Sequence, residues 1–279
     1  LESLIKAGAL DSLGWKRSQL FHLLDTLIEY GHQRQKAREE QAFLLFSEDY
    51  LQPPEIPAEI HSLPEWEEEV LLAYEKEVLG TYLSSHPLAR YKKRLNRLIS
   101  HTVEAIDPEE DFDREVRLAG IVVSVKLLKT KKEERMAAFV LEDLSGQIDV
   151  TVFPEPYSKY HPYLKEGQLI WVKGRMSIDS FDARKVLASQ ILPLEEALEK
   201  LARKTIIRLP LDYLSEEDLS QLHKVLASSP GECPLYLELE KADSVYLIQS
   251  AEYQAVSPSE AFLNEVEALL GPDAVLVEY

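Results

Sequence analysis

The stretch VRLAGIVVSVKLL (116–128) opens a series of five predicted β-strands that decides the fold class. Two more strands, a helical insert and two final strands follow it, with the sequences MAAFVLEDL (136–144), GQIDVTVF (146–153), EPYSKYHPYL (155–164), QLIWVKGRMSI (168–178) and ARKVLASQIL (183–192). Three strands, a helix and two further strands are the order of an OB-type barrel. Barrels of this type are partly open and often bind single-stranded nucleic acid.

The composition indicates a soluble, multidomain protein. The 279 residues leave room for two or three domains, and no apolar run is long enough to span a bilayer, so we expect no membrane partner. The single cysteine, Cys233, excludes a disulfide framework and favours a reduced, cytoplasmic location. The chain opens at Leu1 inside an apparent amphipathic helix, without a signal peptide, which suggests a piece of a longer protein.

The acidic charge is unevenly distributed along the chain. The net charge is −18, yet residues 110–190 hold 13 Lys or Arg and 13 Asp or Glu, so the predicted barrel is neutral. Residues 191–279 hold 6 Lys or Arg and 17 Asp or Glu, a net charge of −11. We therefore expect the tail to contact protein rather than phosphate.

The first predicted hairpin loop, KLLKTKKEER (126–135), is the most basic loop in the chain. It sets five cations against two glutamates, and the cations are Lys126, Lys129, Lys131, Lys132 and Arg135. Such a loop is typical of a surface that holds a phosphate backbone.

Further candidates for nucleic-acid contact lie on the third and fourth strands. By alternation, Trp171, Lys173 and Arg175 share one face, and Phe153 points away from the apolar side of its strand. An aromatic ring beside cations suits single-strand binding, because each stacked base contributes about 1–3 kcal/mol. A place in the barrel core is the other interpretation of Trp171.

The segment before the barrel is predicted to be helical. In LESLIKAGALDSLG (1–14), a helix, a glycine-centred turn and a second helix form either half of a helix-hairpin-helix, whose amides can hold a phosphate, or a plain corner. Helices are also expected at 18–38, 65–83 and 89–101. The last helix is basic, which fits DNA contact or a solvated face.

The hexapeptide QAFLLF (41–46) lies between a polar helix end and a proline-rich linker, so it has no obvious core of its own. Its placement suits a linear motif in which leucine and phenylalanine fill a partner's pocket while glutamine makes a polar contact. The alternative is a last helical turn that folds back on its own bundle.

The tail is predicted to be a small α+β domain in the order βαββαβ, with a ferredoxin-like arrangement. Its second helix has Ser257 as the expected N-cap and Gly271 as the expected end.

The motif EKEVLGTYLSSHPL (75–88), together with the first 14 residues and the barrel strands, resembles the C-terminal part of the bacterial DNA polymerase III α subunit, a C-family replicative polymerase. The resemblance covers essentially the whole chain. It implies that QAFLLF binds the β sliding clamp through Gln41, Leu44 or Leu45, and Phe46. It also implies that the tail docks on the τ subunit of the clamp loader, and that the barrel holds single-stranded or primer-template DNA during replication.

The resemblance also implies four regions and no active site. They are the end of a helical clamp-binding domain (1–50), a proline-rich linker with helices (51–112), the OB domain (113–195) and the τ-binding domain (200–279). The parent family is a DNA-directed DNA polymerase, but its palm, with the metal-binding aspartates and Mg²⁺, lies upstream. We therefore expect no catalytic residue, metal ligand or cofactor in this chain.

Two alternatives differ in their sequence requirements. An OB appendage of another enzyme, such as the anticodon-binding barrel of an aminoacyl-tRNA synthetase, would bind tRNA or single-stranded DNA but requires neither QAFLLF nor YLSSHPL. The error-prone paralogue of the same polymerase would carry a degenerate clamp peptide and tail. The presence of these features favours the replicative form.

Overall fold

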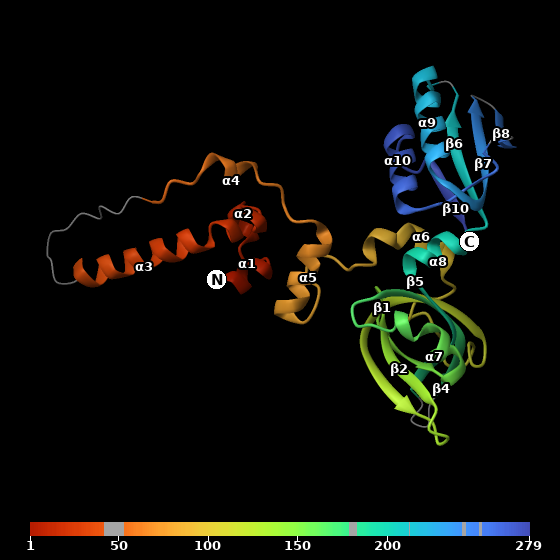
Figure 1. Cartoon of the computed structure of the whole chain (residues 1–279), viewed down its shortest axis with the longest axis horizontal. Helices are drawn as coiled ribbons and strands as arrows, with labels where there is room; N and C mark the ends of the chain where they lie inside the picture. The colour runs from red at the N-terminus through yellow and green to blue at the C-terminus, as the bar shows by residue number, and fades with distance from the viewer. Residues whose placement is uncertain (42–52, 179–182, 212, 242–243, 251–252) are drawn as a thin grey trace. The chain divides into compact units, whose positions relative to one another are not determined.

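The computed structural model describes residues 1–279 except 42–52, 179–182, 212, 242–243 and 251–252. The chain divides into two compact units, Leu1–Pro87 and Leu88–Tyr279 (Figure 1). No helix in the described ranges has the length and apolarity needed to cross a membrane.

The first unit is helical, as predicted, although its helices are shorter and more numerous. They are α1 (Glu2–Lys6), the 3₁₀ turn η1 (Asp11–Leu13), α2 (Arg17–His22), α3 (Leu24–Gln41), α4 (Ala58–Ser62) and α5 (Glu68–Leu79). The helix expected at 18–38 is interrupted at Leu23, the C-cap of α2. Helix α5 stops at Gly80, whose φ of +75° lies in the left-handed region that glycine adopts without strain.

A buried ion pair joins α2 to α5. The Glu75 side chain is fully buried and accepts a hydrogen bond from Arg17 Nη1 at 2.8 Å. Its second carboxylate oxygen accepts from the backbone amides of Leu83 and Ser84 at 2.8 and 2.9 Å. Every interaction that a buried carboxylate requires is therefore supplied by the motif 75–88 and by Arg17.

The turn after α1 is a plain corner. The Gly8 amide donates to the Ile5 carbonyl at 3.0 Å, so it is not available for a phosphate. A Cβ atom at Gly8 would lie 2.1 Å from Arg17 Nη2, which explains the glycine at this position. The occupied amide favours the plain corner, and phosphate binding by a helix-hairpin-helix stays an untested prediction.

The second unit contains the predicted barrel. Its elements are β1 (Glu115–Lys129), β2 (Arg135–Glu142), β3 (Gln147–Val152), α7 (Pro154–Tyr160), the 3₁₀ turn η3 (His161–Tyr163), β4 (Leu169–Ile178) and β5 (Arg184–Pro193). The strands close in the order β1-β2-β3-β5-β4, with β3 and β5 parallel. Alternate side chains such as Phe139, Val150 and Val186 fill the interior, which confirms the OB barrel.

Two glycines of the barrel have structural roles. The Asp143 carboxylate accepts from the amides of Ser145 and Gly146, and so closes the turn between β2 and β3. A Cβ atom at Gly174 would lie 2.5 Å from Val186 Cγ1, and the β4–β5 register shifts between Lys173 and Gly174. This glycine therefore permits the close approach of two strands at the bend.

Helices flank the barrel on one side of its wall. The 3₁₀ turn η2 (Ala89–Tyr91) and α6 (Lys92–Leu98) precede it, and α8 (Leu194–Lys200) follows it. Their apolar side chains pack on β4 and β5 in a second cluster, separate from the barrel interior.

The C-terminal domain has the predicted order of elements but a different sheet. Its elements are β6 (Lys204–Pro210), α9 (Glu216–Ser228), β7 (Pro230–Lys241), β8 (Ser244–Gln249), the short β9 (Ala255–Val256), α10 (Glu260–Leu270) and β10 (Val275–Glu278). The sheet order is β10-β6-β7-β8, and β6 pairs directly with β7 in parallel. The ferredoxin-like arrangement is therefore wrong, because it would place another strand between these two.

The cap of α10 also differs from the prediction. Ser259 is the N-cap, and its hydroxyl accepts from the Phe262 amide. The hydroxyl of Ser257 instead donates to Glu199 Oε2 at 3.2 Å. This hydrogen bond connects the segment before α10 to helix α8. The helix ends at Gly271, as expected.

Candidate nucleic-acid interface

The strand register brings two of the predicted cations into one row on the outside of the barrel. Lys126 lies opposite Ala138, which lies opposite Thr151. Thr151 in turn lies opposite Leu187, and Leu187 opposite Arg175. Directly opposed residues share a sheet face, so all five residues of this row lie on the outer surface. Lys126 and Arg175 are its two ends, and the three uncharged residues lie between them.

An apolar patch lies beside this row at the open end of the barrel. Leu128 is opposite Met136, and Phe153, which is 47% exposed, follows β3 on the same face as Thr151. The ring of Phe153 is therefore exposed on the face that alternation predicts, and its stacking with a base stays a prediction. The sequence prediction missed Met136, although the alternation in MAAFVLE places it on this face.

The basic hairpin is a two-stranded ribbon rather than a loop. The β1–β2 ladder continues to the pair Lys129–Arg135, so only residues 130–134 form the turn. Lys126 points to the outer face, whereas Lys129 and Arg135 lie on the opposite face of the ribbon, and Lys131 and Lys132 lie in the turn. The five cations therefore form two surfaces and a tip, not a single patch.

Some of these cations have carboxylate partners on the surface. Lys129 pairs with Glu133 at 2.5 Å, Lys173 with Glu115 at 3.0 Å and Arg175 with Asp113 at 3.1 Å. These pairs are solvent-exposed, so they are weak and a phosphate can replace the carboxylate. Of the predicted interface cations, Lys126, Lys131, Lys132 and Arg135 make no ion pair with a described residue.

Trp171 does not lie in this interface. The alternation places it on the same face of β4 as Lys173, but α6 and α8 cover that end of the strand. Its side chain is 2% exposed and belongs to the cluster that contains Leu95 and Leu198. The structure contradicts stacking with a base at this position and shows the core role instead, because the period of a strand predicts the face but not what packs on it.

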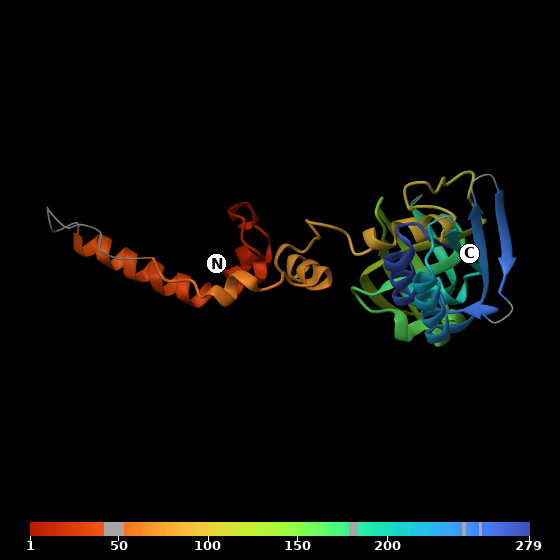
Figure 2. The ribbon, with the colours of Figure 1, turned by 90° about the horizontal axis from the view of Figure 1, so that it is seen from above.

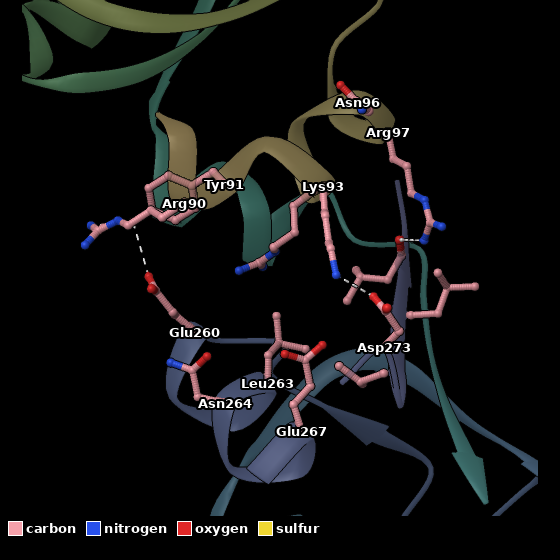
Figure 3. A pocket seen from close by; sticks show the side chains of 14 residues that line it. Arg90, Tyr91, Lys93, Asn96, Arg97, Glu260, Leu263, Asn264, Glu267 and Asp273 are labelled. Carbon is pink, nitrogen blue, oxygen red and sulfur yellow. Dashed lines mark hydrogen bonds and ion pairs between the residues drawn. The ribbon is translucent and has the colours of Figure 1, made fainter. Parts of the chain in front are cut away.

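The basic helix α6 contacts the C-terminal domain. Lys93 Nζ lies 2.7 Å from Asp273 Oδ1, and Arg97 Nη1 donates to the Val277 carbonyl at 3.3 Å (Figure 3). Arg94 donates from Nε to the Tyr279 hydroxyl at 3.1 Å and from Nη2 to the Pro258 carbonyl at 3.0 Å. These contacts join α6 to the C-terminal domain, while Lys93 and Arg97 stay exposed on the solvated face that the sequence predicts.

A cleft of about 420 Å³ lies between α6 and the elements α10 and β10. At one end, the Tyr91 hydroxyl donates toward Glu260 Oε2 at 3.2 Å. Burial and the nearby Glu260 carboxylate raise the pKa of Tyr91, so its phenol stays protonated and can act as this donor. The hydrogen bond to Asp273 likewise raises the pKa of Lys93, and Lys93 lowers the pKa of Asp273.

The other predicted sites receive less support from the structure. Gln41 is the last residue of α3, whereas Leu44, Leu45 and Phe46 lie outside the described residues. Among the residues that the structure describes, no group of His, Cys, Asp or Glu could hold a metal ion.

Comparison with known proteins identifies the barrel and relates the whole chain to one kind of protein. The model of the OB-fold nucleic acid binding domain matches residues 116–194. DNA polymerase III subunit alpha of Escherichia coli K12 is 30% identical over 282 residues, which cover all of this chain and 24% of that protein. The protein of the same name from Halalkalibacterium halodurans is 33% identical over 278 residues, 99% of this chain and 24% of its own length. The chain thus spans about a quarter of the length of these relatives.

Solved structures also resemble part of the chain. The mitochondrial single-stranded DNA binding protein Rim1 of S. cerevisiae is 15% identical, with a TM-score of 0.25 over 29% of this chain and 92% of that one.

Proposed function

The chain is homologous over its whole length to the α subunit of DNA polymerase III, and we propose on this basis that it is the C-terminal tethering part of a bacterial replicative polymerase. In this role it works in the cytoplasm and binds DNA, the sliding clamp and the clamp loader. Polymerisation, with its Mg²⁺, belongs to the part of the protein that precedes this chain.

The outer face of the barrel is the proposed site for single-stranded template DNA. The observation that carries this proposal is the exposed Phe153 ring on the same face as Lys126, next to the unpaired cations of the hairpin tip. The ring supplies base stacking and the cations attract phosphates. Because residues 110–190 have no net charge, the barrel binds weakly and depends on the tethers around it.

Binding of a fluorescent oligo(dT) to the chain at low salt tests this role. Charge reversal of Lys129, Lys131 and Lys132 to Glu should lower the affinity by at least about tenfold, and should reduce the salt slope by about 2, since each lost phosphate contact contributes about 0.7. The matched control is Lys159→Glu, an exposed lysine on α7. Unchanged affinity and slope in the triple variant would show that the hairpin does not hold DNA.

The sliding clamp is the proposed partner of residues 41–46. Gln41 is the last residue of helix α3, and the residues that precede it in this helix are mainly polar and exposed. The variants Gln41→Ala and Phe46→Ala should each weaken binding of the chain to the clamp at least about tenfold, because such motifs depend on a few anchor side chains. Gln33→Ala, an exposed change in the same helix, is the control.

The τ subunit of the clamp loader is the proposed partner of the C-terminal domain. Its support is the family relationship and the acidic charge of residues 191–279, which disfavours DNA. Binding of τ to the whole chain, measured by calorimetry, should be lost when residues 200–279 are deleted, while oligo(dT) binding persists. If τ binds the shortened chain equally well, the assignment fails.

A further inference from the structure

Strand β8 forms an exposed edge of the C-terminal sheet. All six of its residues are exposed, and Val245, Tyr246, Leu247 and Ile248 retain between 44% and 64% of their accessible surface. Figures 1 and 2 show β8 at the end of the sheet, beyond the helices α9 and α10. Neither face of this strand is therefore covered.

The two edge strands of the sheet differ in length, charge and cover. The opposite edge strand, β10, has only four residues, and its Glu278 pairs with Lys204 at 3.0 Å. Arg97 of α6 also donates to the Val277 carbonyl of β10. One edge is thus short, charged and covered, whereas the other has no cover in the described structure.

The sequence of β8, SVYLIQ (244–249), lacks the usual protection of an edge strand. It contains no charged residue and no proline, and its four central side chains are large and apolar. Natural proteins normally protect a free edge strand with charged residues or proline, because its unpaired backbone N–H and C=O groups can pair with strands of other chains. An edge of this composition therefore indicates a strand-binding surface.

The charges beside β8 indicate which strand would fit. Val245 lies opposite Glu240, and Leu247 lies opposite Glu238, so carboxylates and apolar side chains share the face that the helices leave open. Arg208 pairs with Glu238 at 3.0 Å, whereas the described residues supply no ion pair for Glu240. With a net charge of −11 over residues 191–279, this face favours cations among the apolar side chains of a partner.

We propose that β8 is a docking edge for an extended segment of a partner protein whose side chains alternate between apolar and basic. The segment pairs with the backbone of β8 and adds one strand to the sheet. Its apolar side chains cover Val245 and Leu247, and its cations approach Glu240. This deepens the proposed docking role of the domain, and it rests on that proposal only for the identity of the partner.

The test uses the whole chain and a capped seven-residue peptide of alternating lysine and valine, with binding followed by NMR. The double variant Val245→Lys with Leu247→Lys should lower peptide affinity at least tenfold, because it removes apolar contact and adds like charge. Leu219→Lys, an equally exposed apolar position on α9, should leave the affinity unchanged. A peptide N-methylated at alternate residues should bind at least tenfold more weakly, since it cannot complete the ladder.

Three results would overturn the proposal: equal binding of a glutamate–valine peptide, equal binding by the double variant, or protection of β8 only through pairing with a second copy of the chain. Binding of τ to the same variants separates this inference from the proposed function. Peptide binding without any binding of τ to the unaltered chain would refute τ as the partner and leave the docking edge intact.

Discussion

The basic hairpin of the barrel and the basic helix α6 have similar compositions but different environments. The end of the hairpin contains KTKKEER (129–135) and the helix contains KKRLNRL (92–98). In the helix, Lys93, Arg94 and Arg97 all bond to groups that lie at least 160 residues later in the chain. The hairpin receives no such partner in the described structure. Basic composition alone therefore does not separate cations that are free for a ligand from cations that contact a distant segment of the same chain.

Arg17 in the first unit is a buried cation that pairs within its own chain. Breaking its pair with Glu75 should have the largest effect on stability of the variants considered. Glu75→Gln should destabilise the first unit by up to about 3–5 kcal/mol, because it breaks a buried ion pair and leaves Arg17 only the half-exposed carboxylate of Asp11 as a counter-charge. Hydrogen exchange of α5 measures this change. Glu77→Gln, an exposed change on the same helix, is the control and should have little effect. Equal protection in both variants would mean that the buried pair does not hold the unit together.

The same pair predicts a dependence on pH. Burial alone would raise the pKa of Glu75, but hydrogen bonds from Ser84, Arg17 and Leu83 outweigh it and lower the pKa from its ordinary value of 4.5 to about 2. A lowered pKa stabilises the folded state fully above pH 4.5, and this contribution is lost as the pH falls toward 2. The protection of α5 should therefore decline over this range, and the decline should be absent in Glu75→Gln.

The second effect in size concerns the unpaired cations of the hairpin. Reversal of Lys126, Lys131 and Lys132 to Glu should lower oligo(dT) affinity by at least about tenfold at 50 mM salt, because three phosphate contacts become repulsive. Fluorescence anisotropy measures the affinity. If reversal of the ion-paired Lys173 and Arg175 had a larger effect than this triple change, the strand face and not the hairpin would be the main contact.

An effect of similar size is expected at the junction of α6 and the C-terminal domain. Arg94→Ala removes two hydrogen bonds from a charged donor, to Tyr279 and Pro258, and should weaken this contact by about 1–3 kcal/mol. Faster hydrogen exchange in β10, with unchanged exchange in β2, would confirm it. Loss of protection in both strands would instead show that Arg94 supports the barrel itself.

The smallest expected effect is that of α6 on DNA binding. The variant Lys93→Glu with Arg97→Glu should leave oligo(dT) affinity within about twofold of the original, because α6 lies against the acidic C-terminal domain, which repels phosphate. A tenfold loss would show that α6 releases its partners to bind DNA, and the contrast between the two basic segments would no longer hold.

Much of the fold could be predicted from the sequence, because local patterns control it. Alternation located all five barrel strands, and Gly271 was correctly assigned to a helix end. The candidate site was predicted only in part. Phe153 and the hairpin cations lie at the surface as expected, but Trp171 is buried under helices whose packing no local pattern shows.

Composition and periodicity by themselves determined the barrel, the βαββαβ order and the acidic tail, since each depends on residues close together in the chain. Only the tertiary structure decided the pairing of β6 with β7, the burial of Trp171, the partners of α6 and the bare edge of β8. These features depend on contacts between segments far apart in sequence. The free energy of such a contact depends on the side chains of both segments, so the local pattern of one segment cannot predict it.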